Sequence, residues 1–344
     1  MWPTLYEIQT AAQPIGVHTY GLMILAAFCG AFILVHLRAQ RIGLHPDRVI
    51  PLYVAAAVGG LLGGRILYAL AVGSAEASAR AGSTLELLWI LISDPSWLFS
   101  SGGFAVYGGI IGGTLAVGAT SHFLGILPWK LADIAAPAVL LGMGIGRFGC
   151  FFAGCCHGAE VPHFEPTMGL LPESFRGGQI WLSDEFPYMA TEFASGNGGV
   201  SRLTDVPLYP TQLWAAFVLL ALAAYLSWVW ERRRFDGQIA ALALILEPFY
   251  RITVEAFRAD HRGYAFSWPV SEGLASWLPS GMTQAGASLG DGHMMGITTS
   301  QAIGIGSLLF GVAIFVLRRN AGVAEETPVS SGEEDFDDVP DAIL

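Results

Sequence analysis

The segment LADIAAPAVLLGMGIGRFGCFF, residues 131–152, contains only two charged side chains, Asp133 and Arg147. An α-helix crosses the hydrocarbon core of a bilayer with about 20 mostly apolar residues, so this segment is long enough and apolar enough to span a membrane. Six further segments share this character, at about 17–37, 49–71, 103–124, 208–230, 238–257 and 297–317. The sequence therefore predicts an all-α integral membrane protein of about seven transmembrane helices.

The composition agrees with a bilayer as the solvent. Charged residues make up 13% of the chain, whereas a typical soluble domain has about 25%. The net charge of −11 arises mostly at the C-terminus, where eight acidic residues follow Ala321. Because the stretch 321–344 has little apolar content, we predict a disordered cytoplasmic tail behind a membrane domain at 1–320. The sequence has no basic stretch of the kind that binds nucleic acid, so no such partner is expected.

Most of the positive charges outside the predicted spans fall on one side of the membrane. They follow the first, third, fifth and seventh spans, as Arg38, Arg41, Arg48, Lys130, Arg232, Arg233, Arg234, Arg318 and Arg319. The positive-inside rule assigns that side to the cytoplasm, which places the N-terminus outside and the tail inside. No basic residue precedes Arg38, so the first apolar run is expected to be a retained helix and not a signal peptide. The segment 158–207 then forms a long external loop.

Glycines recur every four residues in the second and third spans. The pairs are Gly59 with Gly63, Gly60 with Gly64, Gly108 with Gly112, and Gly109 with Gly113. Small residues at this spacing let helix backbones approach closely within a membrane. Tight helix packing is therefore the expected role of most of them.

Three arginines lie within or at the edge of apolar spans: Arg65, Arg147 and Arg251. A central arginine costs about 2.5–3.5 kcal/mol, so each needs compensation. One explanation is structural, in which the side chain reaches the interface or pairs with an acid such as Glu247, Glu255 or Asp133. The other is functional, and we favour it for Arg147 and Arg251. For Arg65 both explanations stay open.

A guanidinium group binds phosphate through two parallel hydrogen bonds, which lysine cannot reproduce. In a membrane the abundant phosphate belongs to lipid headgroups. Arg147 and Arg251 therefore predict a phospholipid site in the outer half of the bilayer. Arg258 and Arg262 follow the sixth span, where they either orient a headgroup or are ordinary interfacial cations.

Three of the four cysteines lie together, as Cys150, Cys155 and Cys156, and His157 follows them. Four readings stay open: a metal site, a disulfide from Cys150, packing in a glycine-rich turn, or a nucleophilic thiol activated by Arg147. Adjacent cysteines do not easily point at one metal ion, so no metal is expected. Cys29, alone in the first span, is expected to serve packing.

Eight motifs in order resemble one family. They are HTYGLM (18–23), GGRILY (63–68), GGFAVYGGIIGG (102–113), DIAAP (133–137), GRFGCFFAGCCHG (146–158), YPTQLW (209–214), FYRITVEAFR (249–258) and TSQAIGI (299–305). This order resembles the phosphatidylglycerol:prolipoprotein diacylglyceryl transferases of the bacterial inner membrane. The resemblance implies a multi-pass inner-membrane enzyme with seven spans and no cofactor.

That family transfers the diacylglyceryl group of phosphatidylglycerol to the lipobox cysteine of a prolipoprotein and releases glycerol phosphate. The resemblance implies that phosphatidylglycerol, a prolipoprotein signal peptide and membrane lipid are partners. Arg147 matches the signature arginine and Arg251 an arginine implicated in catalysis. The substrate-binding positions expected around them are Tyr20, Arg65, Cys150, Cys155, His157, Gln212, Glu247, Glu255 and Arg258.

The chain departs from the family at several polar positions. Tyr107 stands where the family usually has a catalytic or substrate-binding histidine. We therefore predict that Tyr107 is a catalytic residue, together with Arg147 and Arg251. Glu247 replaces a tyrosine, and Cys150, Cys155 and His157 replace asparagine, glutamate and tryptophan. His157 is a candidate for the lost base. These changes leave two other readings open: a paralogue acting on another acceptor, and a lipid-binding protein without catalysis.

Overall fold

The computed structural model describes residues 4–8, 15–71, 93, 105–171, 179–185, 187–193, 205–258, 264–275, 283–285 and 293–322. The predicted disordered tail lies outside the described residues from 323 onward. Arg262 and most of the predicted external segment 72–102 lie outside them as well.

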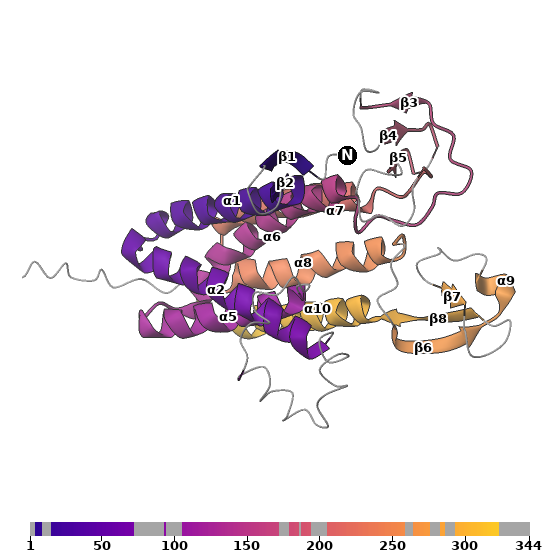
Figure 1. Ribbon diagram of the computed structural model, residues 1–344. Helices are drawn as coiled ribbons and strands as arrows, with labels where there is room; N and C mark the ends of the chain where they lie inside the picture. The colour runs from indigo at the N-terminus through magenta and orange to yellow at the C-terminus, as the bar shows by residue number, and fades with distance from the viewer. Residues whose placement is uncertain are drawn as a thin grey trace, which may run out of the picture.

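Seven long helices form the described part of the bundle (Figure 1). They are α1 (Thr19–Arg41), α2 (Pro46–Ala71), α5 (Val106–Phe123), α6 (Pro128–Ala153), α7 (Thr211–Trp230), α8 (Gln238–Glu255) and α10 (Thr299–Arg318). Each falls on one predicted span. Five of them, α1, α2, α6, α7 and α10, are long and apolar enough to cross a bilayer. The predicted class, an all-α membrane protein, is confirmed, while the number of spans and their orientation stay predictions.

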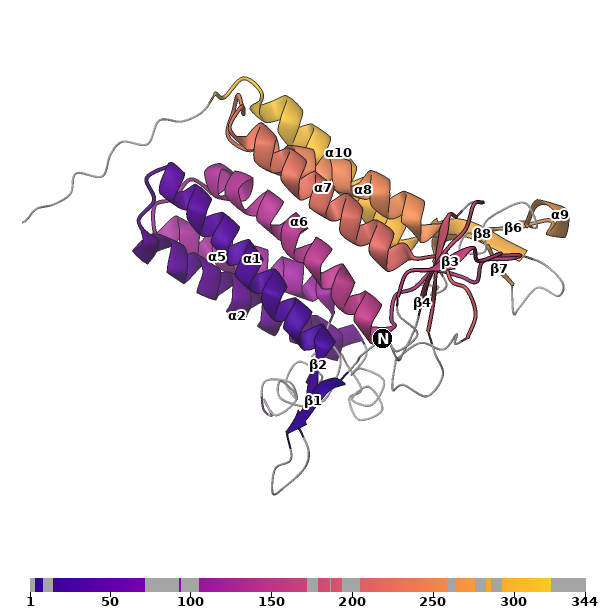
Figure 2. The same ribbon diagram turned by 90° about the horizontal axis from the view of Figure 1, so that it is seen from above.

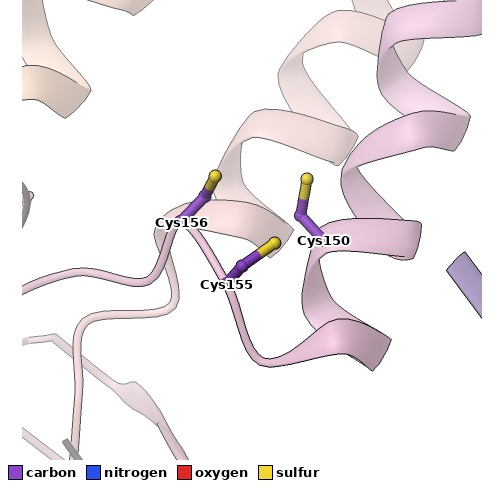
Figure 3. A group of neighbouring side chains, drawn as sticks. All are labelled: Cys150, Cys155 and Cys156. Carbon is purple, nitrogen blue, oxygen red and sulfur yellow. The ribbon is translucent and has the colours of Figure 1, made fainter. Parts of the chain in front are cut away.

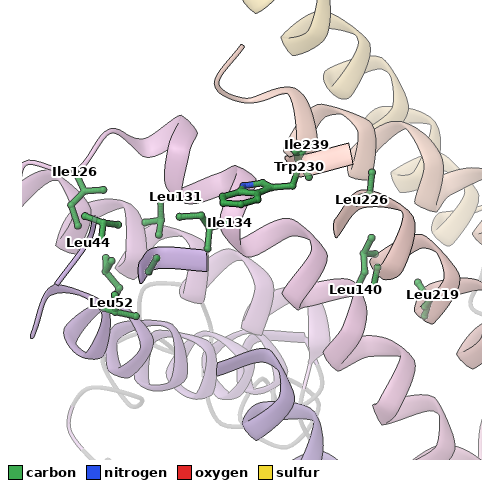
Figure 4. Packing of buried hydrophobic residues seen from close by; sticks show 13 residues of the cluster. Leu44, Leu52, Ile126, Leu131, Ile134, Leu140, Leu219, Leu226, Trp230 and Ile239 are labelled. Carbon is green, nitrogen blue, oxygen red and sulfur yellow. The ribbon is translucent and has the colours of Figure 1, made fainter. Parts of the chain in front are cut away.

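Helix α6 lies between two groups of helices (Figure 2). It packs against α1 on one side and against α7 and α8 on the other. Helix α2 packs on α5, and α8 packs on α10. A buried apolar cluster joins the groups (Figure 4); its members include Leu44, Leu52, Leu131, Ile134, Leu226, Trp230 and Ile239.

Glycines bring α2 and α5 into backbone contact. A Cβ atom added to Gly112 would lie 2.3 Å from the carbonyl oxygen of Gly59, and one added to Gly63 would lie 2.3 Å from that of Gly108. No real Cβ atom tolerates such distances, so a larger residue at either position would force the helices apart. The predicted packing role of these four glycines is confirmed.

Several basic residues that follow the predicted spans lie together at one end of the bundle. Arg41 pairs with Glu231 across α1 and the end of α7, with Nη1 and Oε1 2.6 Å apart. The Arg38 guanidinium lies over the Trp230 ring, 5.1 Å from its centroid. At the end of α10, Arg318 donates a hydrogen bond to the carbonyl of Asp236. These contacts place Arg38, Arg41 and Arg318 at the same end of the bundle, while the side of the membrane that this end faces stays a prediction.

Asp133 has a structural role at this same end. Its side chain is fully buried and accepts hydrogen bonds from the backbone N–H groups of Gly237, Ile239 and Ala240, at 2.9–3.0 Å. These groups open α8, where backbone donors have no partner within the helix. Asp133 therefore caps α8, and the arginine near it is Arg233, with Nε 3.9 Å from Oδ2.

Small antiparallel sheets lie at the opposite end (Figure 1). The strands are β1 (Thr4–Ile8), β2 (Ile15–His18), β3 (Met168–Gly169), β4 (Gln179–Leu182), β5 (Met189–Glu192), β6 (Tyr264–Val270), β7 (Thr283–Ala285) and β8 (His293–Thr298), and a short helix α9 (Glu272–Ala275) follows β6. The predicted external loop 158–207 contains β3, β4 and β5. Phe193 of this loop and Leu208, which directly follows it, pack with Phe151 and Leu213, which fastens the loop to α6 and α7.

Candidate active site

A small pocket lies at the end of the bundle that carries the sheets. Its lining residues are Arg147, Tyr250, Arg251, Val254, Glu255 and Arg258. Arg147 comes from α6, and the others come from the last turns of α8 or directly follow it. The spacing of three, four and seven residues places the α8 side chains on one helix face. The pocket lining therefore holds three guanidinium groups and one carboxylate, an arrangement suited to an anion.

Arg251 is held between two helices. Its Nη1 lies 3.6 Å from Glu247 Oε1, one turn earlier on α8. Its Nη2 donates a hydrogen bond of 3.1 Å to Ser300 Oγ at the start of α10. The Arg251 and Glu247 side chains are 19% and 18% exposed, so the pair is only partly desolvated. These contacts fix the direction of the guanidinium group before any ligand arrives.

Glu255 and Arg258 form a second, more deeply buried pair. Glu255 Oε2 lies 4.0 Å from Arg258 Nε, and both side chains are 6% exposed. Thr298 Oγ1 donates to Glu255 Oε1 at 3.4 Å, and Thr298 also caps α10 in a capping box with Gln301. The start of α10 thus helps to position both arginines. Ser300 contacts Arg251 directly, and Thr298 holds Glu255, which pairs with Arg258.

The turn after α6 is held by the first residues of α7. Gly154 ends α6 with φ +67°, and Cys156 has φ +58°. Thr211 Oγ1 donates to the Cys156 carbonyl, and Gln212 Nε2 donates to the Cys155 carbonyl, both at 3.0 Å. The structure places Gln212 beneath this turn with no exposed surface, whereas the sequence predicted a place in the lipid pocket.

Three thiols meet in this turn. The sulfur atoms of Cys150, Cys155 and Cys156 all lie within 4.8 Å of one another (Figure 3). All four cysteines of the chain are free. Hydrogen bonds with the thiols of Cys150 and Cys155 lower the pKa of Cys156, and the positive charges of Arg258 and Arg147 act in the same direction. Adjacent cysteines do not easily point at one metal ion, yet here the sulfurs of Cys155 and Cys156 both lie close to that of Cys150, and Cys156 has a left-handed backbone.

Among the remaining predicted residues with described side chains, Tyr20 and Arg65 are not part of the pocket lining. Tyr20, in the first turn of α1, lies against α6, since a Cβ atom added to Gly149 would be 3.2 Å from its ring. Arg65 is half-buried on α2. Tyr107 belongs to the first turn of α5, and its side chain lies outside the described part of the chain. The structure therefore brings Arg147, Arg251, Glu247, Glu255 and Arg258 together and leaves Tyr107 untested.

Tyr250 and Ser300 are site residues that the sequence reasoning did not assign. Tyr250 lines the pocket, and Ser300 receives the Arg251 hydrogen bond while only 2% exposed. Both belong to quoted motifs, FYRITVEAFR and TSQAIGI. Membership in a motif was the available signal, but only the structure shows that Tyr250 lines the pocket and that Ser300 contacts Arg251.

His157 points toward the external loop. Its Nδ1 lies 2.9 Å from the Gly158 carbonyl oxygen, and its ring is 5.8 Å from the Phe193 ring. His157 is absent from the residues that line the pocket. We therefore expect His157→Ala to retain most of the catalytic activity, measured as transfer per folded protein. A loss of more than about 100-fold, the size of a missing general base, would instead identify His157 as that base.

Comparison with known proteins identifies the family. The family described as prolipoprotein diacylglyceryl transferase matches residues 7–317. A phosphatidylglycerol--prolipoprotein diacylglyceryl transferase 2 of Clostridium perfringens is 30% identical over 251 residues, covering 72% of this chain and 81% of the relative. The corresponding transferase of Chromohalobacter salexigens is 31% identical over 274 residues, covering 78% and 85%. The family match runs through α6 and α8, which supply the pocket lining, and the chain belongs to the prolipoprotein diacylglyceryl transferase family.

Proposed function

We propose that this protein transfers the diacylglyceryl group of phosphatidylglycerol to the lipobox cysteine of prolipoproteins and releases glycerol phosphate. The observation that carries this proposal is the pocket in which Arg147, Arg251 and Arg258 face one carboxylate, Glu255. The names of the relatives state the same donor and acceptor for those proteins. The pocket lies at the bundle end opposite the basic cluster, where an exported acceptor would meet it.

The reaction explains why the site needs fixed cations. A carbon–sulfur bond forms to the glycerol carbon of the diacylglyceryl group, while the bond from that carbon to the phosphate oxygen breaks. The phosphate takes the electron pair, so negative charge grows on the leaving group, and the acceptor thiol gives its proton to a base. Preorganised donors aimed at developing charge stabilise such a transition state. Arg251, held by Ser300 and Glu247, and Arg147 on α6 have this role.

We propose further that the protein lies in the inner membrane with the basic end in the cytoplasm and the pocket toward the outer leaflet. The gathering of Arg38, Arg41, Arg233 and Arg318 at one end supports this orientation. Tyr107, Tyr20 and Arg65 are proposed to complete the substrate site next to α6.

The proposal is tested by rescue of a bacterial strain whose own diacylglyceryl transferase can be depleted. We expect the wild-type gene to restore lipidation of a reporter prolipoprotein, measured by its mass and by incorporation of labelled lipid. Purified protein with labelled phosphatidylglycerol should release glycerol phosphate only when a lipobox peptide is present. Tight lipid binding without release, together with failed rescue, would show a lipid-binding protein; release that depends on a different acceptor would show a paralogue.

A further inference from the structure

The thiol cluster lies outside the residues that line the anion pocket, and the proposed reaction does not use it. We propose that Cys150, Cys155 and Cys156 bind one soft monovalent metal ion, Cu(I), through three thiolates. Metal–thiolate bonds of about 2.3 Å in a trigonal site separate the sulfurs by about 4 Å. The three sulfurs already lie within 4.8 Å of one another, so small side-chain rotations complete the site.

The backbone is built to hold the thiols in this arrangement. Cys156 adopts φ +58°, a conformation that residues other than glycine seldom occupy. The carbonyl groups of Cys156 and Cys155 accept hydrogen bonds from Thr211 and Gln212, and these two residues are 1% and 0% exposed. Two fully buried polar side chains from another helix thus impose the turn that makes neighbouring cysteines converge.

The three sulfur ligands determine which metal ion fits the cluster. Thiolate sulfur is a soft ligand that favours Cu(I), whereas structural Zn²⁺ sites have four protein ligands. Within the part of the chain that the structure describes, no fourth histidine, cysteine or carboxylate joins the three sulfurs. His157, next in sequence, has its Nδ1 at the Gly158 carbonyl instead. A three-coordinate ion therefore fits this cluster better than a four-coordinate one.

The charge of the occupied site is balanced by its surroundings. Three thiolates and Cu(I) carry a net charge of −2. Arg258 and Arg147 both interact electrostatically with Cys156, and each brings one positive charge to the edge of the cluster. The same two arginines line the anion pocket, so the metal site and the pocket share a boundary.

The test uses the full-length protein in detergent, reduced and free of oxygen, titrated with Cu(I) against a Cu(I)-specific chelator. We expect one equivalent of Cu(I) to be retained, with a thiolate-to-copper charge-transfer band and three sulfur ligands by X-ray absorption. Zn(II) should be retained at least 100-fold more weakly. Cys150→Ser and Cys156→Ser should each lose retention, whereas the matched variant Cys29→Ser, which changes a thiol outside the cluster, should keep it.

A second measurement covers the case in which a serine variant fails to fold. In the wild-type protein, Cu(I) should protect Cys150, Cys155 and Cys156 from alkylation and leave Cys29 reactive, as read by peptide mass spectrometry. The proposal is overturned if reduced wild-type protein retains no Cu(I), if retention survives Cys156→Ser, or if Zn(II) binds equally well. A disulfide among the three cysteines in protein isolated without oxygen would overturn it as well. Each of these outcomes is independent of transferase activity.

Discussion

Arg147→Ala is expected to lower diacylglyceryl transfer by about 100- to 1,000-fold, the effect of removing one donor aimed at a developing anion. Arg147 lines the pocket from α6, and the other lining residues, Tyr250, Arg251, Val254, Glu255 and Arg258, belong to the α8 side. Without Arg147 the leaving phosphate would be contacted by cations from one side only. The measurement is release of labelled glycerol phosphate from phosphatidylglycerol vesicles with a lipobox peptide.

Two variants sharpen this expectation. Arg147→Lys keeps the charge but loses the planar pair of donors, so its activity should lie between those of the wild type and Arg147→Ala. The control Arg232→Ala removes an exposed arginine at the opposite end of the bundle, whose Nη1 donates a hydrogen bond to the Trp228 carbonyl. This variant should leave transfer unchanged. Wild-type turnover by Arg147→Ala would refute the assignment of this arginine to the leaving group.

Gly112→Ala is expected to lower the temperature at which the detergent-solubilised protein aggregates by several degrees. The added Cβ would lie 2.3 Å from the Gly59 carbonyl oxygen and 2.8 Å from the Gly63 Cα. Both neighbours are backbone atoms, so no side-chain rotation relieves the clash and α2 must move away from α5. Overpacking of this kind costs about 1–3 kcal/mol.

Gly118→Ala is the matched control, since it makes the same substitution on the same helix. A Cβ atom at Gly118 would meet no atom within 4 Å, and alanine has the higher helix propensity. The Gly118→Ala protein should therefore be as stable as the wild type or slightly more stable. Equal aggregation temperatures for the two alanine variants would contradict the role assigned to the glycine contact.

The sequence predicted the helices well because each spanning segment needs about 20 mostly apolar residues of its own to cross the hydrocarbon core. All seven predicted spans coincide with long helices, and the four-residue glycine spacing predicted the contact of α2 with α5. The anomaly of arginines in apolar segments also predicted the pocket, since Arg147 and Arg251 face the same space. These features depend on local composition, because the hydrocarbon core of the bilayer favours apolar segments and penalises charged side chains.

What the sequence did not reveal depends on contacts between distant segments. The convergence of Cys155 and Cys156 requires a left-handed residue held by α7, and no spacing rule for cysteines contains that. Asp133 was considered as an arginine's partner, but it lies where α8 begins and accepts three backbone hydrogen bonds. The hydrogen bond from the Gln212 amide to the Cys155 carbonyl also depends on such a contact, while the predicted place of Gln212 in the lipid pocket stays a prediction.

The charges of α8 have a consequence for the biogenesis of the protein. Glu247, Arg251 and Glu255 stand four residues apart on one helix face, and a charged residue costs up to about 2.5–3.5 kcal/mol on translocon scales at the centre of a span and less toward its end. Insertion of α8 into lipid without its partners is therefore unfavourable. Its partners Thr298 and Ser300 lie at the start of α10, which leaves the ribosome later. We therefore expect α8 to leave the translocon only after α10 has been synthesised. Arg251 and Glu255 can then contact Ser300 and Thr298 before α8 meets lipid.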